Sequence, residues 1–167
     1  MAYTYSKIAT YTVGSGGIAN VAFLNIPQTY TDLVIKVSAR LTSTDSPILV
    51  NFNGSNSSLS WRRIYGNGTA ASSLSGTDGY FLHGDTSAMT ANTFSNSELY
   101  VPNYTGSNYK SISTDTALET NATAGELFML ASLWSNTSPI NQITFQTYSA
   151  LFAQYSTFHL YGIKAEV

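Results

Sequence analysis

The chain has 167 residues with a net charge of −2, and charged residues make up only 10% of it. This length fits one domain, residues 1–167, with a sizeable core, and the charge argues against nucleic acid or an anionic membrane as a partner. The absence of cysteine excludes disulfides and thiolate metal sites. Serine, threonine and asparagine make up about a third of the chain, so hydroxyl and amide groups are expected to cover its surface.

The N-terminal segment, Met1–Lys7, lacks a basic stretch followed by an apolar one, so we expect no leader peptide. No apolar run approaches the ~20 residues that a membrane span needs. The sequence therefore predicts a protein without a membrane partner.

Turns rich in glycine, asparagine and proline, such as Gly14–Gly17 and Ser135–Pro139, divide the chain into about ten or eleven short segments typical of strands. In chain order, the expected strands lie near residues 4–13, 18–26, 31–41, 47–53, 59–66, 79–83, 95–101, 108–118, 126–135, 140–149 and 155–165. Short strands at this spacing predict an all-β fold, an antiparallel β-sandwich that is jelly-roll-like and has about ten strands.

The clearest strand signal is the segment Thr31–Leu41. Apolar residues occupy every second position, and polar residues fill the positions between them except at Val34. The apolar positions are Leu33, Ile35, Val37, Ala39 and Leu41. A period of two indicates a strand with one buried and one solvated face, as in an antiparallel sheet.

The segment Glu126–Trp134 is apolar on both sets of alternating positions. A strand buried on both faces fits this pattern, and so does a short helix. A strand with one face on the core and the other on a neighbouring subunit fits it as well. We favour a strand over a helix.

Two stretches, Thr69–Thr77 and Thr86–Asn96, are small and polar without a strand pattern. Both are predicted to be irregular. Long loops in a compact domain often carry function, so these two are candidate contact surfaces.

Groups for catalysis or metal binding are sparse. His83 and Asp85 form the best polar pair, but no third ligand stands at a suitable spacing, and a turn histidine after a strand explains His83 more simply. His159 alternates within a strand pattern and is expected to point outward. We therefore expect no catalytic residue, no metal, no cofactor and no enzymatic activity.

Large aromatic and arginine side chains are the best candidates for contact anchors, because these types are enriched at interfaces. Our candidates are Tyr3, Tyr5, Tyr11, Trp61, Arg62 and Arg63. For the arginine pair, a structural alternative stays open, in which one side chain faces solvent and the other pairs with an aspartate. A third possibility is a carboxylate ligand held by the pair.

Several longer phrases of the sequence resemble a known class of proteins. They are Val13–Gly17, Phe23–Ile35, Phe52–Gly54, Trp61–Gly66 and Leu160–Lys164. Together they resemble small virion structural proteins of tailed bacteriophages, in particular the cyanophage-like decoration (cement) or tail-fibre modules. The resemblance implies a β-sandwich on the virion surface, assembled in the host cytoplasm, and it supplies no active-site residues.

Two functions from different classes follow. The first is a capsid decoration (cement) protein that binds the outer surface of the head and stabilises contacts between coat subunits. Its expected partners are the major capsid protein or other virion proteins, and further copies of itself in a trimer. The alternative is a tail-fibre or spike module that recognises host surface glycan. An enzyme such as a depolymerase is disfavoured because no acid–base pair stands out.

Overall fold

The computed structural model describes residues 3–44, 47–119 and 125–165. For residues 3 and 165 it describes the backbone only. This part of the chain contains 12 strands and no helix, and hence no helix that could cross a membrane. The strands are β1 (Tyr3–Thr12), β2 (Asn20–Phe23), β3 (Asp32–Ser38), β4 (Pro47–Phe52), β5 (Leu59–Gly66), β6 (Ala71–Gly76), β7 (Tyr80–His83), β8 (Asn96–Val101), β9 (Lys110–Glu119), β10 (Gly125–Trp134), β11 (Ile143–Gln146) and β12 (Thr157–Ala165).

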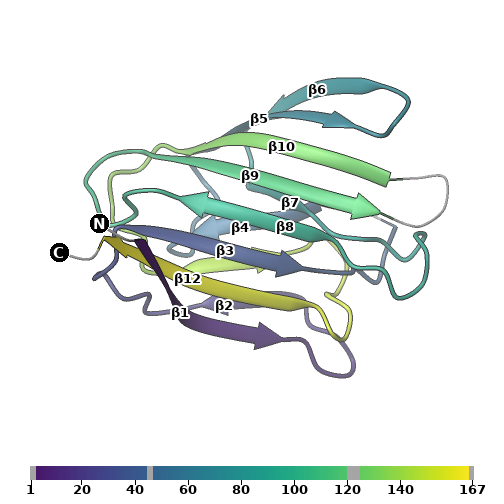
Figure 1. Ribbon diagram of the computed structural model, residues 1–167, viewed down its shortest axis with the longest axis horizontal. Coiled ribbons are helices and arrows are strands. Elements are labelled where there is room, and N and C mark those ends of the chain that lie inside the picture. Colours follow the sequence, from purple (N-terminus) through teal and green to yellow (C-terminus); the bar gives the residue numbers. More distant parts are fainter. Residues whose placement is uncertain (1–2, 45–46, 120–124, 166–167) are drawn as a thin grey trace.

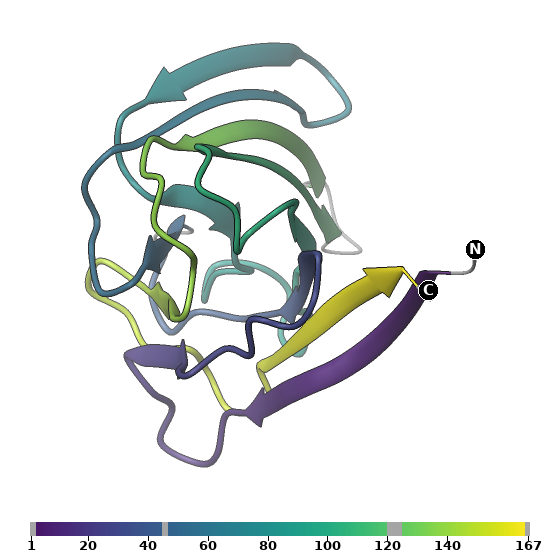
Figure 2. The same cartoon turned by 90° about the vertical axis from the view of Figure 1, so that its left-hand side faces the viewer.

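The strands form two antiparallel sheets packed as a sandwich, which confirms the expected fold class (Figures 1 and 2). The large sheet has the order β1-β12-β3-β8-β9-β10-β5-β6, and the small sheet has the order β2-β11-β4-β7. Without β5, β6, β9 and β10, the chain-order ranks of the remaining strands read 1-8-3-6 and 2-7-4-5. This is the strand order of a jelly roll.

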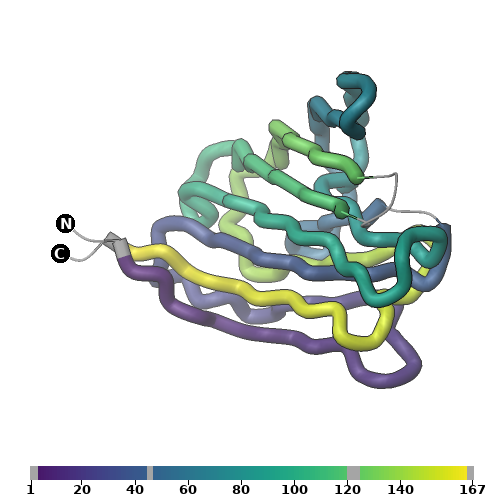
Figure 3. The backbone as a smooth tube through the Cα atoms, turned by 45° about the vertical axis from the view of Figure 1, so that its right-hand side comes forward, coloured from purple at the N-terminus to yellow at the C-terminus, as the bar shows by residue number. Residues whose placement is uncertain are grey.

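The other four strands are two hairpins inserted into the jelly roll. β5 and β6 lie between β4 and β7 in the chain, and β9 and β10 lie between β8 and β11. They pair with one another and lengthen the large sheet beyond β8 (Figures 1 and 3). We call these four strands the extension, and we call β1, β12, β3 and β8 the jelly-roll half of the large sheet.

Alternating side chains explain how the sandwich is held together. In β3, Leu33, Ile35 and Val37 are at most 2% exposed, while Lys36 between them is exposed, as the sequence predicted. Val34, which breaks the alternation, is also fully buried. It lies on the outer face between Tyr100 and Tyr161 of the two neighbouring strands, and these large side chains flank it on both sides.

The prediction that Thr69–Thr77 is irregular is wrong, because residues 71–76 form β6. The strand consists of small residues apart from Leu74 and is exposed on both faces, so it has no apolar alternation to reveal it. It exists because its backbone pairs with β5, from Trp61↔Gly76 to Gly66↔Ala71. Backbone pairing to an existing strand can impose a β conformation that local propensity does not indicate.

The prediction for Thr86–Asn96 holds up to the start of β8. Its backbone wraps the side chain of Arg40, whose Nη1 donates to the carbonyl oxygens of Thr90 (2.8 Å) and Thr93 (3.1 Å). Nη2 donates to the carbonyl oxygen of Met89 at 3.0 Å. Arg40, at a polar position of the alternating segment Thr31–Leu41, therefore holds this loop in place.

Another cation, Lys110, joins two other loops. Its side chain is fully buried, and Nζ donates to the carbonyl oxygens of Gly106 (2.7 Å), Asn108 (2.8 Å) and Ser138 (2.8 Å). The ammonium lies 5.7 Å from the ring centroid of Trp134. Burial lowers the pKa of Lys110, but these acceptors replace the water that the ammonium loses.

Candidate functional site

The outer face of the extension carries an exposed strip of apolar side chains. β10 alternates so that Phe128, Leu130 and Trp134 point into the core, while the positions between them point outward. The strip is Ile64, Leu127, Met129, Ala131 and Leu133, of which Leu133 is half-buried and the others are exposed. Leu127 and Met129 are each 55% exposed and Ile64 is 61% exposed. Contiguous exposed apolar patches of this kind often mark a surface that a partner protein covers.

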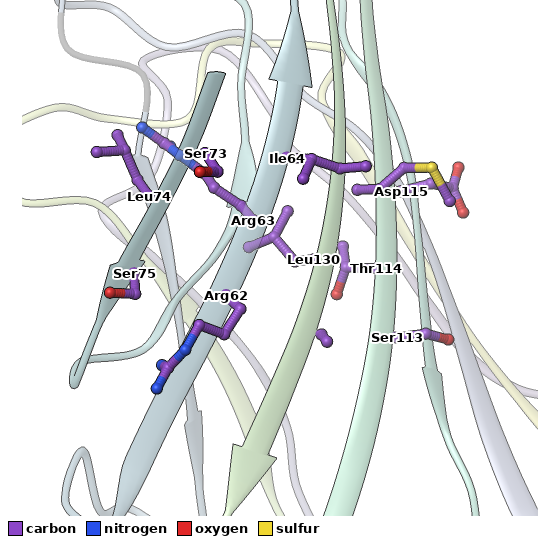
Figure 4. A pocket seen from close by; sticks show the side chains of 12 residues that line it. Arg62, Arg63, Ile64, Ser73, Leu74, Ser75, Ser113, Thr114, Asp115 and Leu130 are labelled. Carbon is purple, nitrogen blue, oxygen red and sulfur yellow. The ribbon is translucent and has the colours of Figure 1, made fainter. Parts of the chain in front are cut away.

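An open hollow of about 840 Å³ lies along part of the strip, where Ile64, Met129 and Ala131 line it. Ile64 on β5 and Met129 on β10 are direct cross-strand neighbours, and Ser73 on β6 and Asp115 on β9 continue the same row. The next row contains Ser75, Arg62, Ala131 and Ser113. The small side chain of Ala131 and the serines leave the space between the larger residues, as Figure 4 shows for the side chains that surround it.

Opposite charges lie on the two sides of the strip. Arg62 on β5 and Asp115 on β9 are both exposed, and β10 runs between them (Figure 4). Partial desolvation, with a further contribution from the neighbouring Glu98, raises the pKa of Asp115 above its ordinary value. Glu98 forms an ion pair with Lys36 at 2.9 Å, and its hydrogen bond raises the pKa of Lys36.

Among the described residues, the ion pair between Lys36 and Glu98 is the only one formed. Arg62 donates a hydrogen bond from Nη1 to the carbonyl oxygen of its neighbour Trp61 at 3.2 Å. Arg62 and Asp115 therefore flank the strip without a charged partner from the described part of the chain.

A second, smaller hollow of about 380 Å³ lies at the opposite end of the large sheet. Tyr5, Asp32, Tyr100 and Ile163 line it. The Asp32 carboxylate accepts hydrogen bonds from the hydroxyl of Tyr100 (2.9 Å) and from the backbone N–H of Asn103 (2.8 Å). The ring of Tyr5 is 55% exposed, so the hollow combines an aromatic face with a fixed carboxylate.

His83 belongs to the core rather than to a site. It ends β7, is 3% exposed, and its ring stacks on Phe128 with centroids 3.6 Å apart. Arg63 Nη1 lies 2.9 Å from Nε2, and because a guanidinium can only donate, Nε2 is the acceptor. Nδ1 then carries the proton and donates to the hydroxyl of Tyr80 at 3.1 Å. Burial, and secondarily the charge of Arg63, lowers the pKa of His83 to about 3.

Asp85 does not join His83. Its backbone bonds to Ala39 and Leu41, its carboxyl is fully buried, and neither carboxyl oxygen has a hydrogen-bond partner among the described residues. His159 lies on the outer face of β12, as expected, with Nδ1 3.1 Å from the hydroxyl of Thr10. The described part of the chain holds no group of three His, Asp or Glu side chains that could bind a metal ion.

The six candidate contact anchors do not lie together. The side chain of Tyr3 is outside the described residues. Tyr5 is on the outer face of the edge strand β1, whereas Tyr11, 37% exposed, is aligned with the core residue Phe158 on the inner face. Arg62 is on the outer face of β5, six strands from β1.

Trp61 and Arg63 face inward on β5. Trp61 is 6% exposed, and its Nε1 donates to Asp78 at 2.8 Å. Arg63 is half-buried among aromatic rings, 5.0 Å from the centroid of Tyr80 and 5.6 Å from that of Phe128. Of the arginine pair, one therefore faces solvent as in the structural alternative, but the other pairs with a histidine rather than an aspartate.

Ile64, Leu127 and Met129 were not among the predicted contact residues. A signal for two of them was present, because Glu126–Trp134 is apolar on both sets of alternating positions. The structure confirms the strand, but its second apolar set is exposed, so the alternative of a strand buried on both faces is wrong.

Comparison with known proteins adds no relative. No family model, no curated protein and no solved structure matches the chain.

Proposed function

We propose that this chain is a structural protein of a tailed-phage virion, a capsid decoration protein that binds the outer surface of the head and stabilises contacts between coat subunits. The observation that carries the proposal is the exposed apolar strip on a rigid jelly-roll shell, with opposite charges on its two sides. A protein that works through contacts with neighbouring subunits needs such a face.

The shape of this face suits a protein surface better than a small molecule. The hollow is open to solvent, and Ser73, Ser75 and Ser113 lie around it. Interfaces of this kind combine an apolar centre with a polar rim. The resemblance to virion structural proteins agrees with this interpretation, and jelly rolls are common among capsid domains. The fold alone assigns no function.

We propose further that the protein is not an enzyme. Of its two histidines, His83 is neutral and buried, and both ring nitrogens are within hydrogen-bond distance of neighbours. A general base must reach its substrate and titrate near the working pH, and His83 does neither.

A stained gel of purified virions tests the proposal. A decoration protein is expected in hundreds of copies per particle, which gives a band comparable to that of the coat protein. The matched experiment uses particles carrying Met129→Asp and particles carrying Leu24→Asp. Leu24 is 60% exposed outside the strip, so its variant should be retained while the Met129 variant is lost. A band too faint for more than a few dozen copies would exclude a decoration role.

Recognition of a host glycan is the second candidate, favoured by the hollow at Tyr5, Tyr100 and Asp32. Sugar rings stack on exposed aromatic faces, and their hydroxyls bond to fixed carboxylates. Binding on a glycan array that is lost in Tyr5→Ala and kept in Tyr155→Ala would support it. Tyr155 is 69% exposed and lines neither hollow, so it is a suitable control.

A further inference from the structure

We infer that the partner covering the apolar strip is a second copy of this chain. The two copies pack face to face around a two-fold axis, and Arg62 of each copy meets Asp115 of the other. This inference rests on the proposed function as a contact protein, and it names the partner at that face.

The positions of Arg62 and Asp115 favour such a two-fold pair. Arg62 shares a cross-strand row with Ala131, and Asp115 shares the next row with Met129. The two charges therefore lie diagonally across β10, with Met129 and Ala131 between them. Figure 4 shows this separation across the hollow.

Two-fold symmetry makes a patch with this charge arrangement self-complementary. In a two-fold interface the same patch is used twice, so a contact from residue i to residue j is repeated from j to i. A patch with one positive and one negative side chain on opposite sides of an apolar centre is complementary to itself. Two equivalent Arg62–Asp115 pairs would then flank a centre in which the strips of the two copies bury each other.

Both Arg62 and Asp115 are able to form a new ion pair with another copy. Neither has an ion-pair partner in the described part of the chain, whereas Lys36 is already paired with Glu98. Glu98 is directly opposite Asp115 across the strands, so the negative side of the patch holds two carboxylates and one lysine. This leaves a negative site that an incoming guanidinium would complement.

The shape of the strip agrees with this arrangement. The hollow is open above Ala131, where the side chain is small, and the long flexible side chain of Met129 is exposed beside it. A second copy supplies side chains of this kind to fill the space. Methionine adapts well to such irregular apolar surfaces.

The test is the mass of the full chain in solution, measured by sedimentation and light scattering over a range of concentrations. Wild type is expected at twice the 18.0 kDa mass of one chain. Arg62→Glu alone and Asp115→Arg alone should each weaken association roughly 10- to 100-fold, because each sets like charges against each other. The double variant Arg62→Glu/Asp115→Arg should restore the wild-type mass.

Two controls separate the interface from general surface effects. Lys7→Glu changes the charge by the same amount as Arg62→Glu, on the same face but at the other edge of the sheet, and should not alter the mass. Thermal melting of each variant checks that it folds.

A wild type that stays monomeric or forms a trimer would overturn the two-fold pair. So would a folded double variant that fails to regain the mass lost in the single variants. A monomer whose Met129→Asp variant is nevertheless lost from virions would assign the strip to another virion protein. That outcome overturns this inference and leaves the proposed function standing, whereas the virion gel tests the proposed function itself.

Discussion

The two halves of the large sheet differ in how their outward side chains find partners. In the jelly-roll half, outward groups satisfy each other: Lys36 pairs with Glu98, and the hydroxyl of Tyr100 donates to Asp32. In the extension, the outward face is an apolar strip, and neither Arg62 nor Asp115 beside it forms an ion pair with another described residue. The first half pairs its outward polar groups with each other, whereas the second leaves apolar side chains exposed to solvent.

The adjacent strands β9 and β10 show the same contrast at closer range. Each has ten residues that alternate between buried and more exposed positions. The outward positions of β9 begin with Ser111, Ser113 and Asp115, whereas those of β10 include Leu127 and Met129. Sheet geometry is the same for both strands, so it does not explain why one outward set is polar and the other apolar.

The largest expected effect separates the two faces of β10. Phe128 is 2% exposed and stacks on His83, so Phe128→Ala should lower the free energy of unfolding by about 3–5 kcal/mol. Met129→Ala, one residue away, should change it by less than about 0.5 kcal/mol in dilute, monomeric protein. Urea unfolding of both variants measures the difference. Equal costs would contradict the assignment of the two faces.

The next effect concerns pH and the buried His83. Its pKa is about 3 in the folded protein against 6.5 ordinarily, so the unfolded chain takes up the proton first as pH falls. The contribution of His83 is therefore complete above about pH 6.5, and it declines by about 1.4 kcal/mol per pH unit between there and about pH 3. Unfolding free energies measured across this range should show the decline.

Two variants assign that slope to one residue. His83→Gln should be less stable at neutral pH but should lose less stability as the solution is acidified. His159→Gln, on the outer face of β12, is the matched control and should keep the wild-type slope. If wild type and His83→Gln showed the same pH dependence, the buried neutral histidine would be ruled out.

The smallest effect is expected on the polar face of the jelly-roll half. The side chains of Lys36 and Glu98 are 54% and 38% exposed, so water and salt weaken their attraction. Lys36→Gln should cost at most about 1 kcal/mol, and less at high salt. Lys7→Gln provides the baseline for losing one exposed lysine. A cost well above this would mean that the pair holds the sheet together rather than solvating its surface.

Much of the fold could be predicted because burial in a strand follows a period of two. The alternation in Thr31–Leu41 correctly separated buried Ile35 from exposed Lys36, and the turn residues located eleven of the strands. β6 could not be found this way, since none of its residues is buried. The order of strands in each sheet was also beyond reach, because a side-chain period does not identify the neighbouring strand.

The candidate site was harder to predict. Aromatic and arginine residues are frequent both in interfaces and in packed interiors, and Trp61 and Arg63 have the second role here. Their sequence neighbour Arg62 has the opposite orientation, because consecutive residues in a strand face opposite sides. Because Arg62 and Arg63 are consecutive in the strand, only one of them could lie on the same face as Ile64, and that one is Arg62. The apolar second face of β10 was the better guide.

Because Lys110 is buried, chemical modification of its amine can measure local opening of the protein. Its amine is fully enclosed and bonded to loop carbonyls, whereas Lys7, Lys36 and Lys164 are exposed. An amine-acylating reagent should therefore modify those three quickly in the native state and reach Lys110 only when the loops around it separate. The rate at which mass spectrometry detects acylated Lys110 would then measure how often this end of the sandwich comes apart.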